Sequence, residues 1–245
     1  MSLRVDQALV ERALCASREQ AKRLVLAGAV RVNGHPARKP SDSIRPADTL
    51  TVDAPEKYVS RGGHKLEHAL THFQLAVTGL VALDLGASTG GFTDCLLQRG
   101  AQKVFAVDVG TAQLAWKLRC DPRVVVMEKT NARFLKPEQF AAPADLAVVD
   151  CSFISLKKIL PPAVPLLQPT GKIVALIKPQ FEAGKAEADK GRGVITDPAI
   201  HERVLAELAE FVRAQAGLCW RGVVESPLLG PAGNKEFLVL IEKVR

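Results

Sequence analysis

From about residue 60 onward, the sequence alternates short apolar runs with amphipathic segments. Residues 197–215 predict one of the helices between the strands, because Asp197 can cap its first turn and Pro198 suits its first position. Strands that are apolar along their whole length are covered on both faces, so the pattern predicts an α/β fold with a Rossmann-like, doubly wound, mostly parallel sheet. The predicted strands cover residues 81–86, 103–110, 124–129, 145–150, 172–179 and 236–242.

The first predicted strand leads into a glycine-rich loop within LDLGASTGGFTDCLLQRG, residues 83–100. Gly86, Gly90 and Gly91 predict a tight turn into a helix, where the backbone can approach a ligand closely. Asp108 ends the second strand, 22 residues after Gly86. Its carboxylate can accept hydrogen bonds from both hydroxyls of a ribose. The loop and the acid together predict a site for a nucleoside cofactor.

Two features of the loop favour a methyl donor over a nicotinamide dinucleotide. GASTGG differs from G-x-G-x-x-G, and Asp84-x-Gly86 resembles the first motif of the S-adenosylmethionine-dependent methyltransferases. S-adenosyl-L-methionine also carries no pyrophosphate for a helix N-terminus to bind. Asn131 follows the third strand and is expected beside the adenine. The residues expected to bind the cofactor are Gly86, Ser88, Gly90, Gly91, Phe92, Asp108, Asn131 and Asp150.

The amino-terminal segment is more basic than the rest of the chain. Residues 1–45 contain nine Lys or Arg and four Asp or Glu, a net charge of +5, whereas the whole chain carries +7. Ser17 and Gln20 form a capping-box pair for a helix that ends at Gly28. Asn33-Gly34 predicts a tight turn between two strands. The pattern indicates a compact basic unit with an anionic partner.

SREQAKRLVLAGAVRVNG, residues 17–34, resembles the RNA-binding domain named for ribosomal protein S-four. In that family two helices and the following turn present Lys and Arg to folded RNA. The resemblance implies ribosomal RNA or ribosomal subunits as partners, although a basic helix face can also be merely solvated. We expect a small α+β S-four-like domain over residues 1–55, a linker over 56–60 and a second domain over 61–245. The residues expected at the RNA interface are Arg4, Arg18, Lys22, Arg23, Arg31, Arg61 and His64.

Four separated polar residues stand at or near the predicted strand ends. Asp150 and Lys178 end the fourth and fifth strands, Glu236 begins the last strand, and Lys65 lies in a helix expected before the first strand. The carboxyl ends of parallel strands are where such sheets carry their chemistry. Taken singly, each residue is better explained as a cap or a surface ion pair.

Together, the four residues match the Lys-Asp-Lys-Glu set of the FtsJ-type ribose 2′-O-methyltransferases. YVSRGGHKLEHAL, LDLGASTGGFTD, VDCSFISL, LIKPQFEAGK and GNKEFL make the whole chain resemble the TlyA family. Its members are named haemolysins or ribosomal RNA cytidine-2′-O-methyltransferases. The resemblance implies large-subunit RNA as the substrate, with small-subunit RNA as a candidate for an additional substrate. It implies that the catalytic residues are Lys65, Asp150, Lys178 and Glu236.

A ribose hydroxyl is a poor nucleophile, so a general base must take its proton as the methyl group is transferred. A lysine can do so only in its neutral form, which burial or a neighbouring cation favours. The resemblance implies Lys178 as this base, with Lys65 as the neighbouring cation. Asp150 and Glu236 are expected to orient Lys178 and hold the hydroxyl. This chemistry requires no metal, and no His, Cys and Asp cluster in the sequence indicates one.

Two other functions compete with methyl transfer. One is a membrane-lytic protein, although no segment offers the roughly 20 apolar residues of a span and the charged amino terminus lacks a secretory signal. The other is a ribosome-assembly factor that binds RNA without catalysis.

Five dispersed cysteines without a CxxC pair favour a reduced compartment. We therefore expect a cytoplasmic protein with no stable membrane association and no obligate protein partner. The charged segment 182–193 is expected either to act as a lid or to remain solvated.

Overall fold

The computed structural model describes residues 2–53 and 56–244, and the chain divides into two compact units, Met1–Lys57 and Tyr58–Arg245. Residue 55, the expected end of the first domain, lies with residue 54 outside the described residues. The second unit begins at Tyr58, whereas the sequence places the start of the second domain at residue 61. Each unit has a hydrophobic core of its own.

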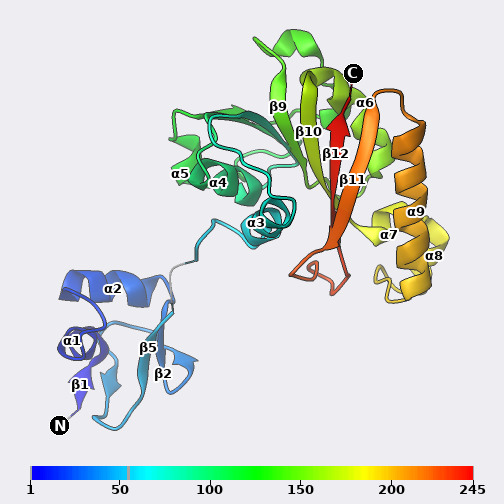
Figure 1. Ribbon diagram of the computed structural model, residues 1–245. Coiled ribbons are helices and arrows are strands. Elements are labelled where there is room, and N and C mark those ends of the chain that lie inside the picture. The colour runs from blue at the N-terminus through cyan, green and yellow to red at the C-terminus, as the bar shows by residue number, and fades with distance from the viewer. Residues whose placement is uncertain (1, 54–55, 245) are drawn as a thin grey trace. The chain divides into compact units, whose positions relative to one another are not determined.

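The amino-terminal unit packs two helices against short strands (Figure 1). Strand β2 pairs with β3 and β5, and β1 pairs with β4, all antiparallel. Leu9, Val25 and Val30 are buried between the helices and strands. The elements are β1 (Leu3–Arg4), α1 (Val5–Glu11), α2 (Arg18–Leu26), β2 (Val30–Val32), β3 (His35–Pro36), β4 (Ser43–Ile44) and β5 (Leu50–Val52).

Local signals in the sequence explain the start of α2 and the turn after β2. Ser17 Oγ accepts a hydrogen bond from the backbone N of Gln20 at 3.2 Å, as predicted for an N-cap. The Gln20 side chain accepts from the backbone N of Ala16 at 3.0 Å, one residue before the position that a capping box uses. Asn33 and Gly34 have φ values of 50° and 81°, which the predicted tight turn requires.

A seven-stranded sheet forms the centre of the second unit, in the order β11-β12-β10-β9-β6-β7-β8. Strands β8, β7, β6, β9 and β10 are parallel, and β12 is antiparallel to both of its neighbours. The predicted mostly parallel, doubly wound sheet is confirmed. Its strands are β6 (Val81–Leu85), β7 (Lys103–Val107), β8 (Val124–Met127), β9 (Ala144–Val149), β10 (Leu167–Ile177), β11 (Leu218–Glu225) and β12 (Phe237–Lys243).

Helices cover both faces of this sheet because successive strand residues point in opposite directions (Figure 1). Leu83 and Leu85 join the core that includes residues of α6 and α9, whereas Ala82 joins the core that includes α3 and α4. The helices are α3 (Gly62–His72), α4 (Gly91–Gln98), α5 (Trp116–Arg119), α6 (Leu160–Ala163), α7 (Pro179–Glu182), α8 (Lys185–Lys190) and α9 (Pro198–Ala214). Short 3₁₀ turns are η1 (Ala132–Phe134), η2 (Pro137–Gln139), η3 (Leu156–Lys158) and η4 (Val164–Leu166).

Strand β11 was not predicted from the sequence. Its run LCWRGVVE carries Arg221 and Gly222 in the middle, and most of its residues are only half-buried. It lies at the edge of the sheet, where one side lacks a neighbouring strand and the pairing with β12 shifts register between Trp220 and Gly222. An edge position tolerates such mixed composition. Among the described residues, no helix combines the length and the apolar character that crossing a bilayer requires.

Candidate active site

The carboxyl ends of the parallel strands meet at one edge of the sheet, and three of the expected catalytic residues lie there. Asp150 follows β9 directly, and Lys178 follows β10. Glu236 precedes β12, which runs antiparallel to β10 with Ile177 paired to Phe237. This register brings Lys178, which follows Ile177, and Glu236, which precedes Phe237, to the same edge.

The four expected catalytic residues form two ion pairs. Lys65, near the start of α3, has its Nζ 2.5 Å from Glu236 Oε2. Lys178 Nζ lies 2.6 Å from Asp150 Oδ1 and donates a hydrogen bond to Ser152 Oγ at 2.9 Å. Glu236 is only 1% exposed, so its charge needs the Lys65 partner. Asp150, rather than Glu236, is therefore the carboxylate that contacts Lys178.

Both ion pairs line one cavity of about 590 Å³. Its walls come from α3, the loop after β6, the loop after β9, the segment after β10 and the segment before β12. A cavity of this size is typical of a small-molecule or substrate site. Other lining residues include Arg61, Ser88, Gly91, Phe92, Phe181 and Asn234.

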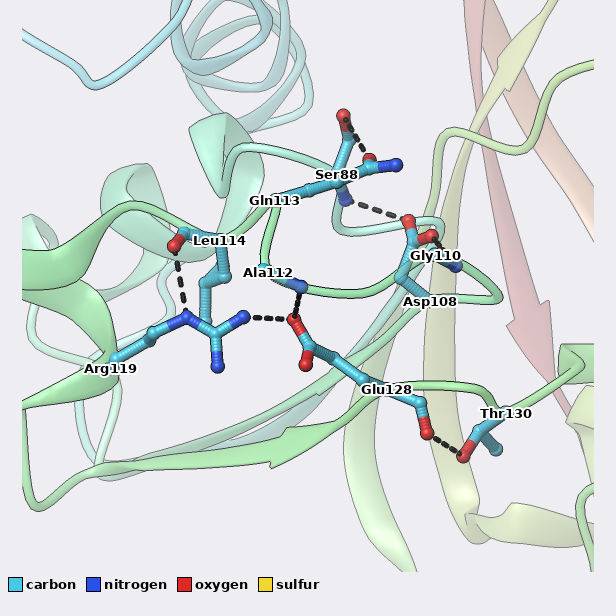
Figure 2. Close-up of polar contacts among 9 residues, drawn as sticks. All are labelled: Ser88, Asp108, Gly110, Ala112, Gln113, Leu114, Arg119, Glu128 and Thr130. Atoms are coloured by element: carbon cyan, nitrogen blue, oxygen red, sulfur yellow. Dashed lines mark hydrogen bonds and ion pairs between the residues drawn. The ribbon is translucent and has the colours of Figure 1, made fainter.

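A second cavity, of about 390 Å³, adjoins the first and shares Gly86, Ser88 and Asp150 with it. Asp108 lies in its wall: Oδ2 accepts from the backbone N of Ser88 at 2.8 Å, and Oδ1 accepts from the backbone N of Gly110 at 2.7 Å (Figure 2). These bonds fix the carboxylate and leave each oxygen with further acceptor capacity.

Asn131 lines the second cavity together with Asp108. Its Oδ1 accepts from the backbone N of Arg133 at 3.0 Å and caps η1, so the side chain is held in place by its oxygen. The amide nitrogen keeps its donors for other partners. The structure thus brings Asp108 and Asn131 from two neighbouring strand ends to one cavity.

Glu128, which was not predicted from the sequence, holds the loop that follows Asp108 in place. Its carboxylate accepts from the backbone N of Ala112 at 2.7 Å and forms an ion pair with Arg119 (Figure 2). Arg119 Nε in turn donates to the carbonyl O of Leu114 at 3.2 Å. Its place in the sequence could have indicated this role, because Glu128 immediately follows β8 and so lies at the same edge of the sheet as Asp108.

Gly86 is required where the loops after β6 and β9 approach each other. Its φ is 90°, and a Cβ there would lie 2.7 Å from the carbonyl O of Asp150. A residue with a side chain would be strained at this φ and would clash with Asp150, so only glycine fits here. Gly90, also expected at the cofactor, lines neither cavity, because a side chain there would point toward Leu118.

Asp84 lies fully buried beneath the glycine-rich loop. Its Oδ2 accepts from Thr93 Oγ1 at 2.6 Å, whereas Oδ1 has no hydrogen-bond partner among the described residues. Burial, with a smaller contribution from Asp150, raises the pKa of Asp84 to about 7. A buried polar atom without a partner is a site for a water molecule or a ligand group.

Phe153 is a site residue that sequence reasoning did not single out. It lines both cavities although it is 89% exposed, and its φ of 62° is rare for an aromatic residue. Its ring lies 5.0 Å from that of Phe181. An exposed ring at a cavity rim offers a stacking surface to a planar ligand. A Phe near a strand end is ordinarily assigned to the core, and its loop conformation leaves no sequence signal.

In the amino-terminal unit, the buried carboxylate of Asp6 joins two arginines that were expected to contact RNA. Arg4 Nε donates to Asp6 Oδ1 at 2.9 Å, and Arg18 Nη2 donates to Oδ2 at 3.2 Å. The hydrogen bonds from Arg4 lower the pKa of Asp6 to about 2. Both guanidinium groups stay about half exposed, so they remain accessible to a further anion.

The other basic residues expected at RNA lie in different environments. Arg31, on β2, is neutralised by Asp53, with Nη2 and Oδ2 2.9 Å apart. Lys22 and Arg23 are exposed on α2. The two that belong to the second unit are Arg61, which lines the larger cavity, and His64, whose ring packs edge-on against Tyr58.

Residues 58–243 match the FtsJ-like methyltransferase family, and residues 3–50 match the S4 domain. The chain is 51% identical to the 16S/23S rRNA (cytidine-2′-O)-methyltransferase TlyA of Mycobacterium tuberculosis, over 96% of this chain and 88% of the relative. It is 34% identical to the 23S rRNA (cytidine-2′-O)-methyltransferase TlyA of Campylobacter jejuni, over 81% and 79%. A solved structure described as a hemolysin of Streptococcus thermophilus has a TM-score of 0.75 and 46% identity, over 99% of this chain and 89% of that one. The chain belongs to the TlyA family of FtsJ-like methyltransferases that carry an amino-terminal S4 domain.

Proposed function

We propose that this chain transfers a methyl group from S-adenosyl-L-methionine to the ribose 2′-hydroxyl of a cytidine in large-subunit ribosomal RNA. The observation that carries the proposal is the presence of the Lys178–Asp150 and Lys65–Glu236 ion pairs on the wall of one cavity. The relative from M. tuberculosis, named for this reaction, supports the chemistry. The S4 domain supports an RNA substrate, and a ribosomal substrate would place the enzyme in the cytoplasm.

The residues of the second cavity fit this cofactor. Asp108 keeps acceptor capacity for two ribose hydroxyls, and Asn131 keeps amide donors for an adenine edge. Asp84 lies outside both cavities, so its buried Oδ1, which has no hydrogen-bond partner among the described residues, would reach the amino group of a methionine moiety only through water. S-adenosyl-L-methionine would supply a methyl group on a positively charged sulfur, and the carbon–sulfur electron pair would return to sulfur on transfer.

Lys178 is the proposed general base for the hydroxyl proton. An amine can accept this proton only in its neutral form. Asp150 and Ser152 hold the amine at a fixed point of the cavity wall. The Lys65–Glu236 pair, on the same wall, is proposed to hold the ribose, so that the hydroxyl oxygen lies in line with the methyl group.

Large-subunit RNA is the proposed substrate because it is common to the names of both relatives. The M. tuberculosis relative is named for 16S and 23S RNA, and the C. jejuni relative for 23S RNA alone. Mapping of 2′-O-methylated cytidines in both ribosomal subunits, from cells with and without the gene, tests this assignment. A gene-dependent methyl group confined to small-subunit RNA would overturn it.

Replacement of Lys178 by alanine tests the base directly. We expect Lys178→Ala to abolish methyl transfer to ribosomal RNA while binding of S-adenosyl-L-methionine, measured by calorimetry, persists, because the cofactor residues lie mainly in the second cavity. Lys158→Ala, at an exposed position outside both cavities, is the matched control. Substantial activity in Lys178→Ala would contradict the assignment.

Membrane lysis is the second candidate function, because the S. thermophilus structure is described as a haemolysin. A liposome-leakage assay run beside the methyl-transfer assay separates the two. Leakage by wild-type protein without methyl transfer would favour lysis. RNA binding without methyl transfer would instead favour a non-catalytic assembly factor.

A further inference from the structure

The carboxylate of Glu182 connects two segments that carry active-site residues. Glu182 is the last residue of α7, four positions after Lys178. Its Oε2 accepts from Ser155 Oγ at 2.6 Å, and its Oε1 accepts from the backbone N of Leu156 at 2.7 Å. Ser155 and Leu156 stand at the start of η3, at the end of the loop that begins with Asp150. Glu182 itself lines neither cavity.

The Glu182 contacts are the outermost of several cross-links that the described residues make between the segments 150–156 and 178–182. The innermost are the ion pair of Lys178 with Asp150 and its hydrogen bond to Ser152, and between these and Glu182 lies the contact of the Phe153 and Phe181 rings. At the strand end, Asp150 is itself fixed by a backbone hydrogen bond to Leu85. Beyond it, the cross-links add to the packing of Ile154 and Leu156 against the core in holding the loop.

The Glu182 cross-link fixes the backbone in the outer part of this loop, next to the Leu156 side chain that is buried in the core. The carboxylate is partly buried and accepts two short hydrogen bonds, one of them from the first N–H of a 3₁₀ turn. Burial raises the pKa of Glu182, which the hydrogen bonds from Ser155 and Leu156 oppose. Without an acceptor at this point, the Leu156 N–H would lose its partner, and this backbone conformation of the loop would be less stable.

We propose that Glu182 is a positioning residue that holds the loop 150–156 against the Lys178 segment, and so sets the geometry of Asp150, Ser152 and Phe153 around the general base. The inference rests on the proposed methyl transfer. Glu182 lines neither cavity, so it acts through these three residues.

Two substitutions at Glu182 distinguish positioning from a general effect on folding. Glu182→Ala removes both acceptors, and we expect kcat to fall by about tenfold to a hundredfold, the range for slight misplacement of reacting groups, with smaller changes in KM. Glu182→Gln keeps an oxygen for Leu156 and an amide donor for Ser155, so we expect kcat near that of the wild type. Glu210→Ala, exposed on α9, is the control. Equal kcat in Glu182→Ala and wild type, or equal losses in both Glu182 variants, would overturn the proposal.

Hydrogen exchange at the Leu156 amide gives a readout that does not depend on activity. We expect its protection to be lost in Glu182→Ala and retained in Glu182→Gln, while amides in α9 stay unchanged in both. If the wild-type protein methylates no RNA, the proposed function fails, but this measurement still decides whether Glu182 holds the loop. Unchanged protection of the Leu156 amide in Glu182→Ala would overturn the inference, whatever the activity assay shows.

Discussion

At the scale of single residues, buried carboxylates fix the position of basic groups in both units. Asp6 is fully buried and holds Arg4 and Arg18, and Glu236 is almost fully buried and holds Lys65. A buried charge without a partner is costly, so each acid keeps its cation in one place. The long basic side chains thereby lose much of their rotamer freedom before a substrate arrives, which lowers the entropy cost of binding.

Replacement of Asp6 by asparagine should destabilise the amino-terminal unit in a pH-dependent way. The pKa of Asp6 is lowered to about 2 in the folded chain, chiefly by Arg4. Its contribution is therefore complete above the unfolded value of about 3.9 and is lost as the pH falls from about 4 toward 2. With half-exposed arginine partners, we expect Asp6→Asn to cost about 1 kcal/mol at pH 7 and almost nothing at pH 2.

Urea denaturation followed by two probes measures this effect. Both tryptophans, Trp116 and Trp220, lie in the second unit, so fluorescence reports that unit whereas far-ultraviolet circular dichroism reports both. The expected loss appears in the dichroism transition alone. Glu11→Gln, an exposed position on α1, serves as the control. Equal stability of Asp6→Asn and wild type at pH 7 would contradict the prediction.

At the scale of elements, local signals were predictable from the sequence and long-range contacts were not. The cap at Ser17 and the parallel strands follow from short patterns of side chains, and the shared edge of Asp150 and Lys178 follows because strand ends converge there. The positions of Phe153 and Glu182 depend on loop conformations that contacts between distant segments determine. No short pattern in the sequence contains that information.

The charged segment 182–193 illustrates the same limit. From sequence it was either a lid or a solvated loop, whereas in the structure it completes α7 and forms α8. Asn234, which is buried, accepts from the backbone N of Ile195 at 2.8 Å and donates to the carbonyl O of Gly193 at 2.8 Å. These partners are 39 and 41 residues away in the sequence, so the segment is held by contacts that periodicity does not encode.

Asn234→Ala should loosen this part of the cavity wall. The substitution leaves the N–H of Ile195 and the carbonyl of Gly193 without their partner, which costs about 1–3 kcal/mol for a buried group. We expect the fluorescence transition of the second unit to shift to lower urea and amides 193–195 to exchange faster. Gln102→Ala, on the exposed surface of the same unit, is the control. Exchange at 193–195 equal to wild type would show that other contacts hold the segment.

At the scale of the whole molecule, charge and chemistry belong to different units. Residues 1–45 carry a net +5 of the +7 of the chain, whereas both cavities belong to the second unit. Electrostatic attraction to phosphates supplies affinity without base specificity. Under the proposed function, the amino-terminal unit therefore contributes RNA affinity and the second unit contributes the reaction, so substitutions should separate the two effects.

The double substitution Lys22→Ala and Arg23→Ala tests this division in the full chain. Both side chains are exposed on α2, so their loss should leave the fold intact. The slope of log K against log salt concentration is negative, and each phosphate contact removed reduces its magnitude by about 1. We therefore expect the magnitude of the slope for RNA binding to fall by about 2. KM for ribosomal RNA should rise while kcat at saturating RNA is unchanged, because neither residue lies at a cavity.

Lys158→Ala with Arg213→Ala removes two exposed charges from the second unit and should leave the slope as in wild type. An unchanged slope in the α2 variant would remove these residues from the RNA interface, and a fall in kcat would show that the two units do not act separately.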